Sequence, residues 1–150
     1  MSKRHDPDEL KRKLHAFAKE APFFQLMDLE VLDFGPRWSQ CRISPRQQLR
    51  NPNGSVHGGV IATLIDAGIT QAMLMTDEYQ VGVREEKGFL TTVDLRIRYL
   101  RPMTAGAMTC ESKIVHLGRR IIHASSAIQN DEGQDVALGD AILSLISRST

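Results

Sequence analysis

Residues 60–75 constrain the fold of this chain more than any other part of the sequence. Apolar or small side chains occupy nearly every helical face of these 16 residues, so a helix formed here has no wide polar stripe. Such a helix must be buried, and it is too short to span a bilayer comfortably. We therefore expect a curved β-sheet to wrap around one long central helix.

Runs typical of β-strands surround that helix. Two apolar-rich runs flank Gly35-Pro36 and predict a hairpin, and the runs after residue 107 are separated by turn signals that predict an antiparallel meander. Strands are expected at residues 26–34, 38–43, 89–99, 108–115, 121–129 and 136–146. Residues 89–99 alternate, with one face expected to carry Val93, Leu95, Ile97 and Tyr99 and the other Asp94, Arg96 and Arg98. The pattern predicts an α+β fold with five or six antiparallel strands.

The length of 150 residues fits one domain spanning residues 1–150. Asp6 is a candidate N-cap, with Pro7 at the first helical position and Glu9 in the capping box, which predicts a short amphipathic helix over about residues 6–20. Pro22 disfavours helical geometry in Ala21, so this helix is expected to end there.

Composition narrows the class of function. A hydrophobic fraction of 41% with 25% charged residues is typical of a globular chain, and the net charge of +1 argues against a nucleic-acid partner. Cys41 and Cys110 show no spacing typical of a zinc site and are interpreted as reduced structural thiols, with no metal or other cofactor expected. The charged N-terminus lacks the apolar stretch of a signal peptide, and no window reaches membrane-spanning length, which predicts a cytoplasmic protein without membrane attachment.

Asp66 is the most unusual residue, because it places a carboxylate inside an otherwise apolar helix. A buried, unpaired carboxylate costs several kcal/mol or shifts its pKa. Two explanations stay open: Asp66 has a chemical function, or a backbone amide or an arginine satisfies it.

Gly58 and Gly59 precede that helix and lack a Cβ, so a ligand can approach the backbone closely. The unpaired amides and positive dipole of a helix N-terminus suit a carbonyl oxygen that becomes negative in a tetrahedral transition state. The alternative is that these glycines only form a tight turn. His57 is expected to orient this loop, whereas His5, His15, His116 and His123 are interpreted as structural or surface residues.

Spacing along the helix has a consequence for assembly. Asp66 follows Gly58 by eight residues, which is ~12 Å at the helical rise. One small reacting group cannot touch both, so a site that uses both must combine two chains. This predicts a two-fold dimer with two equivalent sites at its interface.

The pattern of Asn51, Gly54, His57, Gly58, Gly59 and Asp66, together with residues 92–102 (TVDLRIRYLRP), resembles the hotdog-fold acyl-CoA thioesterases of the PaaI-like group, which includes the thioesterase superfamily member 2 branch. The resemblance covers about the central third of the chain. It implies an acyl-CoA substrate, with Asp66 as general base or nucleophile and the Gly58 amide as the donor to the carbonyl oxygen. Asn51 is implied to position water or the carbonyl. Thr92 is implied to orient Asp66 or its water, from a strand beside the partner's Asp.

The resemblance also implies dimers that pair into a tetramer, with the phosphates of coenzyme A on the surface between subunits. Basic side chains suit such phosphates, and Arg119 and Arg120 follow Gly118 in a turn. The candidate phosphate ligands are Arg96, Arg98, Arg101, Arg119 and Arg120. Gly59 is a further candidate for substrate binding, because the substrate can approach its backbone closely. The N-terminal helix either covers the acyl pocket or packs on the dimer.

Two other functions compete with hydrolysis. A hotdog hydratase or dehydratase pairs a histidine with a carboxylate, but the dehydratases of fatty-acid synthesis place the histidine well ahead of a glutamate, whereas here His57 precedes Asp66 by only nine residues. A non-catalytic acyl-CoA sensor is the second alternative. Sensors of that kind generally carry a DNA-binding segment, and the region before residue 23 offers only one short helix.

Overall fold

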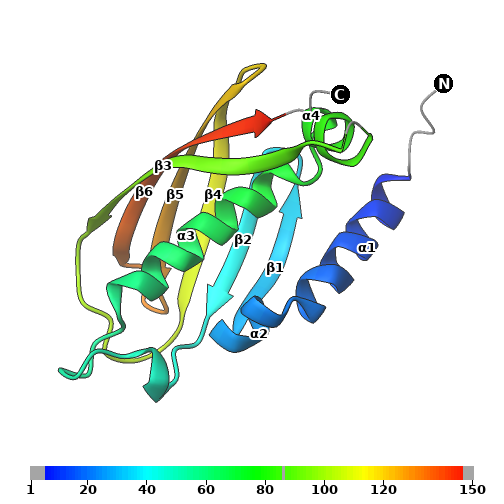
Figure 1. The fold of residues 1–150 in the computed structure, drawn as a ribbon. Coiled ribbons are helices and arrows are strands. Elements are labelled where there is room, and N and C mark those ends of the chain that lie inside the picture. The colour runs from blue at the N-terminus through cyan, green and yellow to red at the C-terminus, as the bar shows by residue number, and fades with distance from the viewer. Residues whose placement is uncertain (1–5, 86, 147–150) are drawn as a thin grey trace.

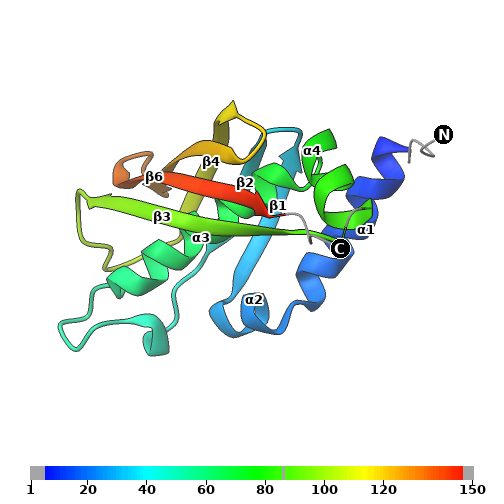
Figure 2. The same cartoon turned by 45° about the horizontal axis from the view of Figure 1, so that its top comes forward.

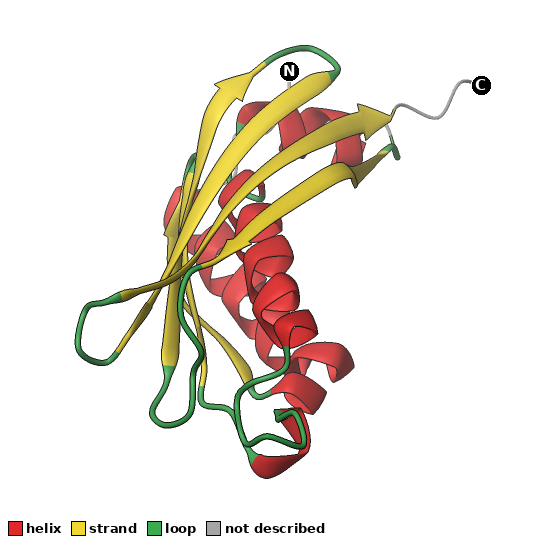
Figure 3. Cartoon of the chain, turned by 90° about the vertical axis from the view of Figure 1, so that its left-hand side faces the viewer, coloured by secondary structure: helices red, strands yellow, loops and turns green. Residues whose placement is uncertain are grey.

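The computed structural model of the chain describes residues 6–85 and 87–146, and it shows a six-stranded antiparallel sheet curved around one long helix (Figure 1). The long helix lies against one face of the sheet, as Figure 3 shows. The helices are α1 (Pro7–Glu20), α2 (Pro22–Met27), α3 (Gly58–Met73) and the single turn α4 (Asp77–Tyr79), with short helical turns η1 (Gln47–Leu49) and η2 (Gln80–Glu85). The strands are β1 (Leu29–Gly35), β2 (Trp38–Ile43), β3 (Phe89–Tyr99), β4 (Met108–Leu117), β5 (Ile121–Asn130) and β6 (Asp135–Ile146). The α+β class, the central helix and the antiparallel sheet are confirmed.

The order of strands across the sheet is β1-β2-β4-β5-β6-β3. β4, β5 and β6 form the predicted meander, but β3 does not precede β4 in space; it pairs antiparallel with β6 at the far edge. Figure 2 shows β3 beside β6, on the opposite side of the sheet from β1. Turn signals predict which strands are neighbours only when a short turn joins them, and the segment from β3 to β4 is not such a turn. Within the described chain, β1 and β3 are therefore the edge strands.

One face of α3 packs directly on the sheet. Its side chains Leu64, Ile65 and Ile69 are fully buried, against β2 and β4 above all. The helix approaches closely because position 68 is glycine: a Cβ there would lie 2.6 Å from the Ser112 hydroxyl. This face forms the core of the molecule.

The opposite face of α3 is only half-buried, which corrects the expectation that the whole helix is buried. The residues on this uncovered stripe are Ala62, Thr63, Asp66, Ala67 and Thr70. They recur at the three- and four-residue spacing of one helical face. The sheet of a single chain curves around only part of the helix, and a sequence pattern cannot show how far that curvature extends.

A β-bulge in β3 changes which residues face the helix. The register with β6 shifts between Thr92 and Asp94, and Val93 is 62% exposed whereas Leu95 packs on the core, so the prediction that the two share a face is wrong. Thr92 and Leu95 both face α3, although strict alternation puts them on opposite faces. The bulge therefore aims Thr92 at the helix.

The N-terminal segment packs along β1 of its own chain. Lys11 Nζ lies 2.6 Å from an Asp33 carboxylate oxygen, and His15 Nε2 lies 2.7 Å from the carbonyl oxygen of Val31. α1 ends at Glu20, and Pro22 begins α2 at its first position, because proline has the helical φ already and needs no amide partner there. The expected strand over residues 26–34 is consequently too long, and β1 begins at Leu29.

Among the described residues, no single helix is long and apolar enough to cross a membrane. α3 taken together with residues 77–83 meets those criteria of length and composition, but the two parts are bent by 87°.

Candidate active site

The loop before α3 is folded back on itself by backbone hydrogen bonds. The Asn51 amide donates to Ser55 O (2.7 Å), and the Gly54 amide donates to Asn51 O (2.9 Å). Gly54 has a φ of +88°, a conformation that favours glycine. The Asn51 side-chain nitrogen reaches Ser55 Oγ (3.3 Å) and Val56 O (3.5 Å), so Asn51 is half-buried against its own loop.

Arg50 holds this loop in place, and no sequence motif indicates it. Its guanidinium donates to Gly54 O (2.9 Å), Thr104 O (2.7 Å) and Pro45 O (3.4 Å). The Val56 amide also donates to Met103 O at 2.8 Å. These bonds join the loop to the segment between β3 and β4, which is distant in sequence. A charged side chain whose partners are backbone carbonyls leaves no pattern in the sequence.

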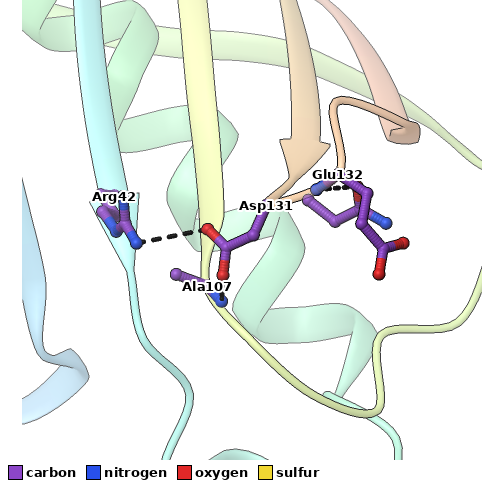
Figure 4. A network of polar contacts seen from close by, with 5 residues as sticks. Arg42, Ala107, Asp131 and Glu132 are labelled. Atoms are coloured by element: carbon purple, nitrogen blue, oxygen red, sulfur yellow. Dashed lines mark hydrogen bonds and ion pairs between the residues drawn. The ribbon is translucent and has the colours of Figure 1, made fainter.

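That segment is anchored in turn by Asp131, in the turn between β5 and β6 (Figure 4). One Asp131 oxygen accepts from the Ala107 amide (3.0 Å), and the other lies 3.3 Å from the Arg42 guanidinium on β2. Beside it, the Glu132 amide donates to Asn130 Oδ1 at 3.0 Å. The loop that carries Asn51 and His57 therefore rests on a chain of contacts from β2 and the β5–β6 turn.

His57 is the N-cap of α3. Its Nδ1 accepts from the Gly59 amide at 2.9 Å, so the neutral ring carries its proton on Nε2. Among the described residues, the Gly58 amide has no hydrogen-bond partner. Gly58 and Gly59 are the first two residues of α3, and neither has a positive φ. The free donor at this helix start is the Gly58 amide, because the Gly59 amide is already bound by His57.

Asp66 lies half-buried on the uncovered stripe of α3, and its Oδ1 accepts from Thr92 Oγ1 at 2.7 Å. The Thr92 that contacts Asp66 belongs to the same chain, and the expectation that its strand lies beside the partner's Asp stays a prediction. The bulge in β3 brings the hydroxyl to this side of the sheet. Within the described residues, neither a backbone amide nor an arginine hydrogen-bonds the Asp66 carboxylate, so the alternative of structural satisfaction by those groups does not hold.

Within one chain the expected site residues form two separate groups. Asn51, His57 and Gly58 meet at the start of α3, and Gly58 lines a cleft of about 340 Å³ that does not include Asp66. Asp66 and Thr92 form the second group, two helical turns farther along.

The arginines also divide into groups. Arg101 lines the same cleft as Gly58, and its Nε donates to Asp135 O at 2.8 Å. Arg119 and Arg120 line a different cleft, of about 530 Å³, near the other end of α3 and opposite Asp77 and Glu78. Arg96 and Arg98 form ion pairs with Asp94 (3.0 Å) and Asp140 (2.6 Å). The guanidiniums of Arg96 and Arg98 therefore already have carboxylate partners.

The other histidines that the structure describes contact other parts of the sheet. His116 and His123 face each other across β4 and β5 with ring centroids 6.0 Å apart, and His15 contacts β1. His5 lies outside the described residues. In the part of the chain that the structure describes, no three His, Cys, Asp or Glu side chains are grouped as a metal site requires.

Residues 53–137 match the family model described as the thioesterase superfamily, which is more than half of the chain. This chain belongs to the thioesterase superfamily. Among curated relatives, the mouse acyl-coenzyme A thioesterase 13 is 30% identical over 106 residues, covering 70% of this chain and 70% of that protein. The medium/long-chain acyl-CoA thioesterase YigI of Escherichia coli is 23% identical over 133 residues, covering 83% and 86% of the two chains.

Solved structures of the superfamily show the same fold. The E. coli PaaI protein from the phenylacetic acid degradation operon superposes with a TM-score of 0.77 at 19% identity, covering 94% of this chain and 96% of that one. Zebra fish thioesterase superfamily member 2 gives a TM-score of 0.73 at 24% identity, with 95% and 99% coverage. The hotdog fold that the resemblance implies is confirmed.

Proposed function

We propose that this protein hydrolyses acyl-CoA thioesters to a free acid and coenzyme A, at sites that two copies of the chain share. The observation that carries the proposal is the 2.7 Å hydrogen bond from Thr92 to Asp66, which orients a carboxylate on the uncovered stripe of α3. The printed names of the mouse and bacterial relatives support the same class of reaction.

Each group has a role in this reaction. As general base, Asp66 takes a proton from water, the water oxygen bonds to the carbonyl carbon as the carbon–sulfur bond breaks, and the proton passes to the leaving thiolate. As nucleophile, Asp66 instead displaces the thiolate to form an acyl anhydride, which water then hydrolyses to the free acid, regenerating the carboxylate. The Gly58 amide stabilises the negative carbonyl oxygen, because it is a fixed donor at a positive helix end. Asn51 positions water or the carbonyl, while His57 holds the loop through its bond to the Gly59 amide. No metal or other cofactor enters these steps.

Two features support a site shared between copies. Gly58 and Asp66 are ~12 Å apart along α3, too far for one thioester to reach both within a chain. β3 is an edge strand with exposed apolar side chains, of which Phe89 is 48%, Val93 62% and Tyr99 54% exposed. An exposed, long apolar edge strand favours pairing with another chain. We propose a homodimer through this edge, with Gly58 of one copy beside Asp66 of the other, and pairing of dimers into a tetramer.

For coenzyme A, we propose that its phosphates are bound by Arg101, Arg119 and Arg120, which line the two clefts. Replacing Arg119 or Arg120 with glutamine should raise KM more than it lowers kcat, because their cleft does not include Gly58. A panel of acyl-CoA variants lacking the 3′-phosphate distinguishes a phosphate ligand from a general electrostatic effect.

A cytoplasmic location stays a prediction.

The first experiment measures free thiol release from aryl, short-chain and medium-chain acyl-CoA esters. Hydrolysis releases one thiol for each ester consumed, whereas hydration of an enoyl-CoA releases none, which separates a hydratase. Tight binding of acyl-CoA without thiol release would instead identify a sensor and would contradict the proposal. The ester with the highest kcat/KM is then the substrate for kinetic measurements on the variants.

The shared site is tested by mixing two inactive variants, Asn51→Ala and Asp66→Ala. In a random mixture half the dimers are mixed, and each mixed dimer has one intact site, so roughly a quarter of the wild-type activity should return. Two samples of the same variant, mixed in the same way, are the control and should stay inactive. No recovery, with subunit exchange confirmed by mass spectrometry, would show that Asn51 and Asp66 act within one chain.

A further inference from the structure

The peptide unit between Gly58 and Gly59 is held at both ends by side chains. The Tyr99 hydroxyl donates to Gly58 O at 3.1 Å, and the Gly59 amide donates to His57 Nδ1 at 2.9 Å. The carbonyl and the amide of a trans peptide point in opposite directions. The two hydrogen bonds therefore restrain the rotation of this peptide plane from opposite sides.

The aromatic ring of Tyr99 also lies against Gly58. A Cβ built on Gly58 would be 3.3 Å from Tyr99 Cε1 and 3.4 Å from its Cζ and hydroxyl oxygen. Tyr99 is the last residue of β3, 41 positions away in sequence, and it lines the same cleft as Gly58. The contact thus joins the start of α3 to the end of the edge strand.

Glycine at position 58 creates a need for such a contact. A residue without a Cβ permits close approach of a ligand, but it also has more conformational freedom than any other residue. A donor to a developing negative charge is most effective when its direction is fixed before the reaction begins. The free Gly58 amide belongs to the preceding peptide, whose carbonyl, His57 O, accepts from the Val60 amide at 2.9 Å. Tyr99 restrains the peptide on the other side of the Gly58 Cα, and so limits rotation of the backbone about that atom.

We propose that Tyr99 is a positioning residue, which holds Gly58 so that its free amide points at the carbonyl oxygen of the thioester. This inference rests on the proposed function, because the amide has this role only if the protein is a thioesterase. Tyr99 acts through Gly58 and takes no part in the bond changes.

The test replaces the hydroxyl while keeping the ring. Tyr99→Phe should lower kcat roughly tenfold, because one neutral hydrogen bond is lost and the amide donor becomes less well directed. KM should stay within about twofold, since ground-state contacts are kept. Ser39→Ala is the matched control: Ser39 Oγ also donates to an α3 carbonyl, that of Gly68, at 2.6 Å, and its loss should leave kcat unchanged.

A spectroscopic measurement separates positioning from a structural effect. In an Asp66→Asn background, a bound thioester with a ¹³C-labelled carbonyl persists, and its infrared stretch reports hydrogen bonding to that oxygen. Adding Tyr99→Phe should shift the stretch to higher frequency, toward its value in the unbound ester, while the dimer mass and the Tm stay unchanged. Adding Ser39→Ala instead should not move it.

The outcomes distinguish this inference from the proposed function. If the wild-type protein releases no thiol from any ester in the panel, the proposed function fails and this inference fails with it. If the wild type is active but Tyr99→Phe keeps both kcat and the carbonyl stretch, only the role of Tyr99 is wrong. A rise in KM alone would make Tyr99 a substrate contact and would also overturn its positioning role.

Discussion

The two faces of α3 differ in what surrounds them and therefore in what their residues can do. On the sheet side, Leu64, Ile65 and Ile69 have no exposed surface. On the opposite side, Asp66 and Thr70 are only half-buried, and Asp66 accepts a hydrogen bond from Thr92. One helix thus supplies the core with one face and a polar site with the other. We expect substitutions on the first face to change stability and those on the second to change activity.

The largest expected effect is from Asp66→Asn on the uncovered stripe. Asparagine keeps the shape of the side chain and an oxygen that can accept from Thr92, but it cannot act as base or nucleophile. We expect kcat to fall about a thousandfold or more, the scale at which a reacting group is lost. The Tm should be unchanged or higher, because polar functional residues often reduce stability. Retained turnover, measured as thiol release, would exclude Asp66 from the chemistry.

Leu64→Ala tests the buried face. Removing these buried methyl groups should reduce the free energy of unfolding by about 3 kcal/mol, measured by urea denaturation, because a cavity remains beneath the helix. Thr63→Ala, one position earlier on the uncovered stripe, is the matched control and should cost less than about 1 kcal/mol. Similar losses at the two positions would contradict the contrast between the faces.

The two thiols beneath the buried face give a measure of its protection from water. Burial raises the pKa of Cys41 to about 12 and that of Cys110 to about 11, from an ordinary value of 9.0. At pH 8 the native chain should therefore react with iodoacetamide roughly a hundredfold more slowly than the unfolded chain, because thiolate is the reactive form. Equal labelling rates for the native and urea-unfolded protein would show that this face is open to solvent.

The same raised pKa values predict how stability depends on pH. The neutral thiols favour the folded state, so their contribution is complete below pH 9.0 and is lost as the pH rises through about 11 to 12. A Cys41→Ala variant should lose less stability between pH 8 and pH 11 than the wild type does, measured by urea denaturation at each pH.

The smallest effect is expected from Thr92→Val. The valine keeps the shape of threonine but removes the hydroxyl that orients Asp66 at 2.7 Å, so kcat should fall about tenfold. Thr92→Ser keeps the hydroxyl and should retain most of the activity. In the Asp66→Asn background Thr92→Val should have little further effect, because the two residues act as a unit. Additive losses would show that Thr92 acts independently of Asp66.

Much of the fold can be predicted from local patterns. The apolar run of α3 and the alternation of β4, β5 and β6 lie in the residues themselves. The position of β3 cannot be predicted from such local patterns. β3 pairs with β6, which is distant in sequence, so only the folded chain brings the two strands together. The alternation of apolar and polar residues does not predict the bulge at Val93 either, because an extra residue shifts the alternation without changing the composition.

The candidate site shows the same division. The spacing of Asn51, His57, Gly58 and Asp66 marks the loop and the helix where the polar groups lie. Arg50 and Tyr99 carry no such signal, because their partners are backbone carbonyls, some of them on distant segments.

The sequence by itself determined a buried central helix, a carboxylate on it, and a glycine pair at its start, because periodicity and residue type act over a few neighbouring positions. Only the tertiary structure decided that the helix has an uncovered face, that Thr92 points at Asp66, and that Tyr99 holds Gly58. These features depend on the curvature of the sheet and on contacts between residues 26 and 41 positions apart. Such contacts form only when the whole chain is folded, so no short stretch of sequence contains them.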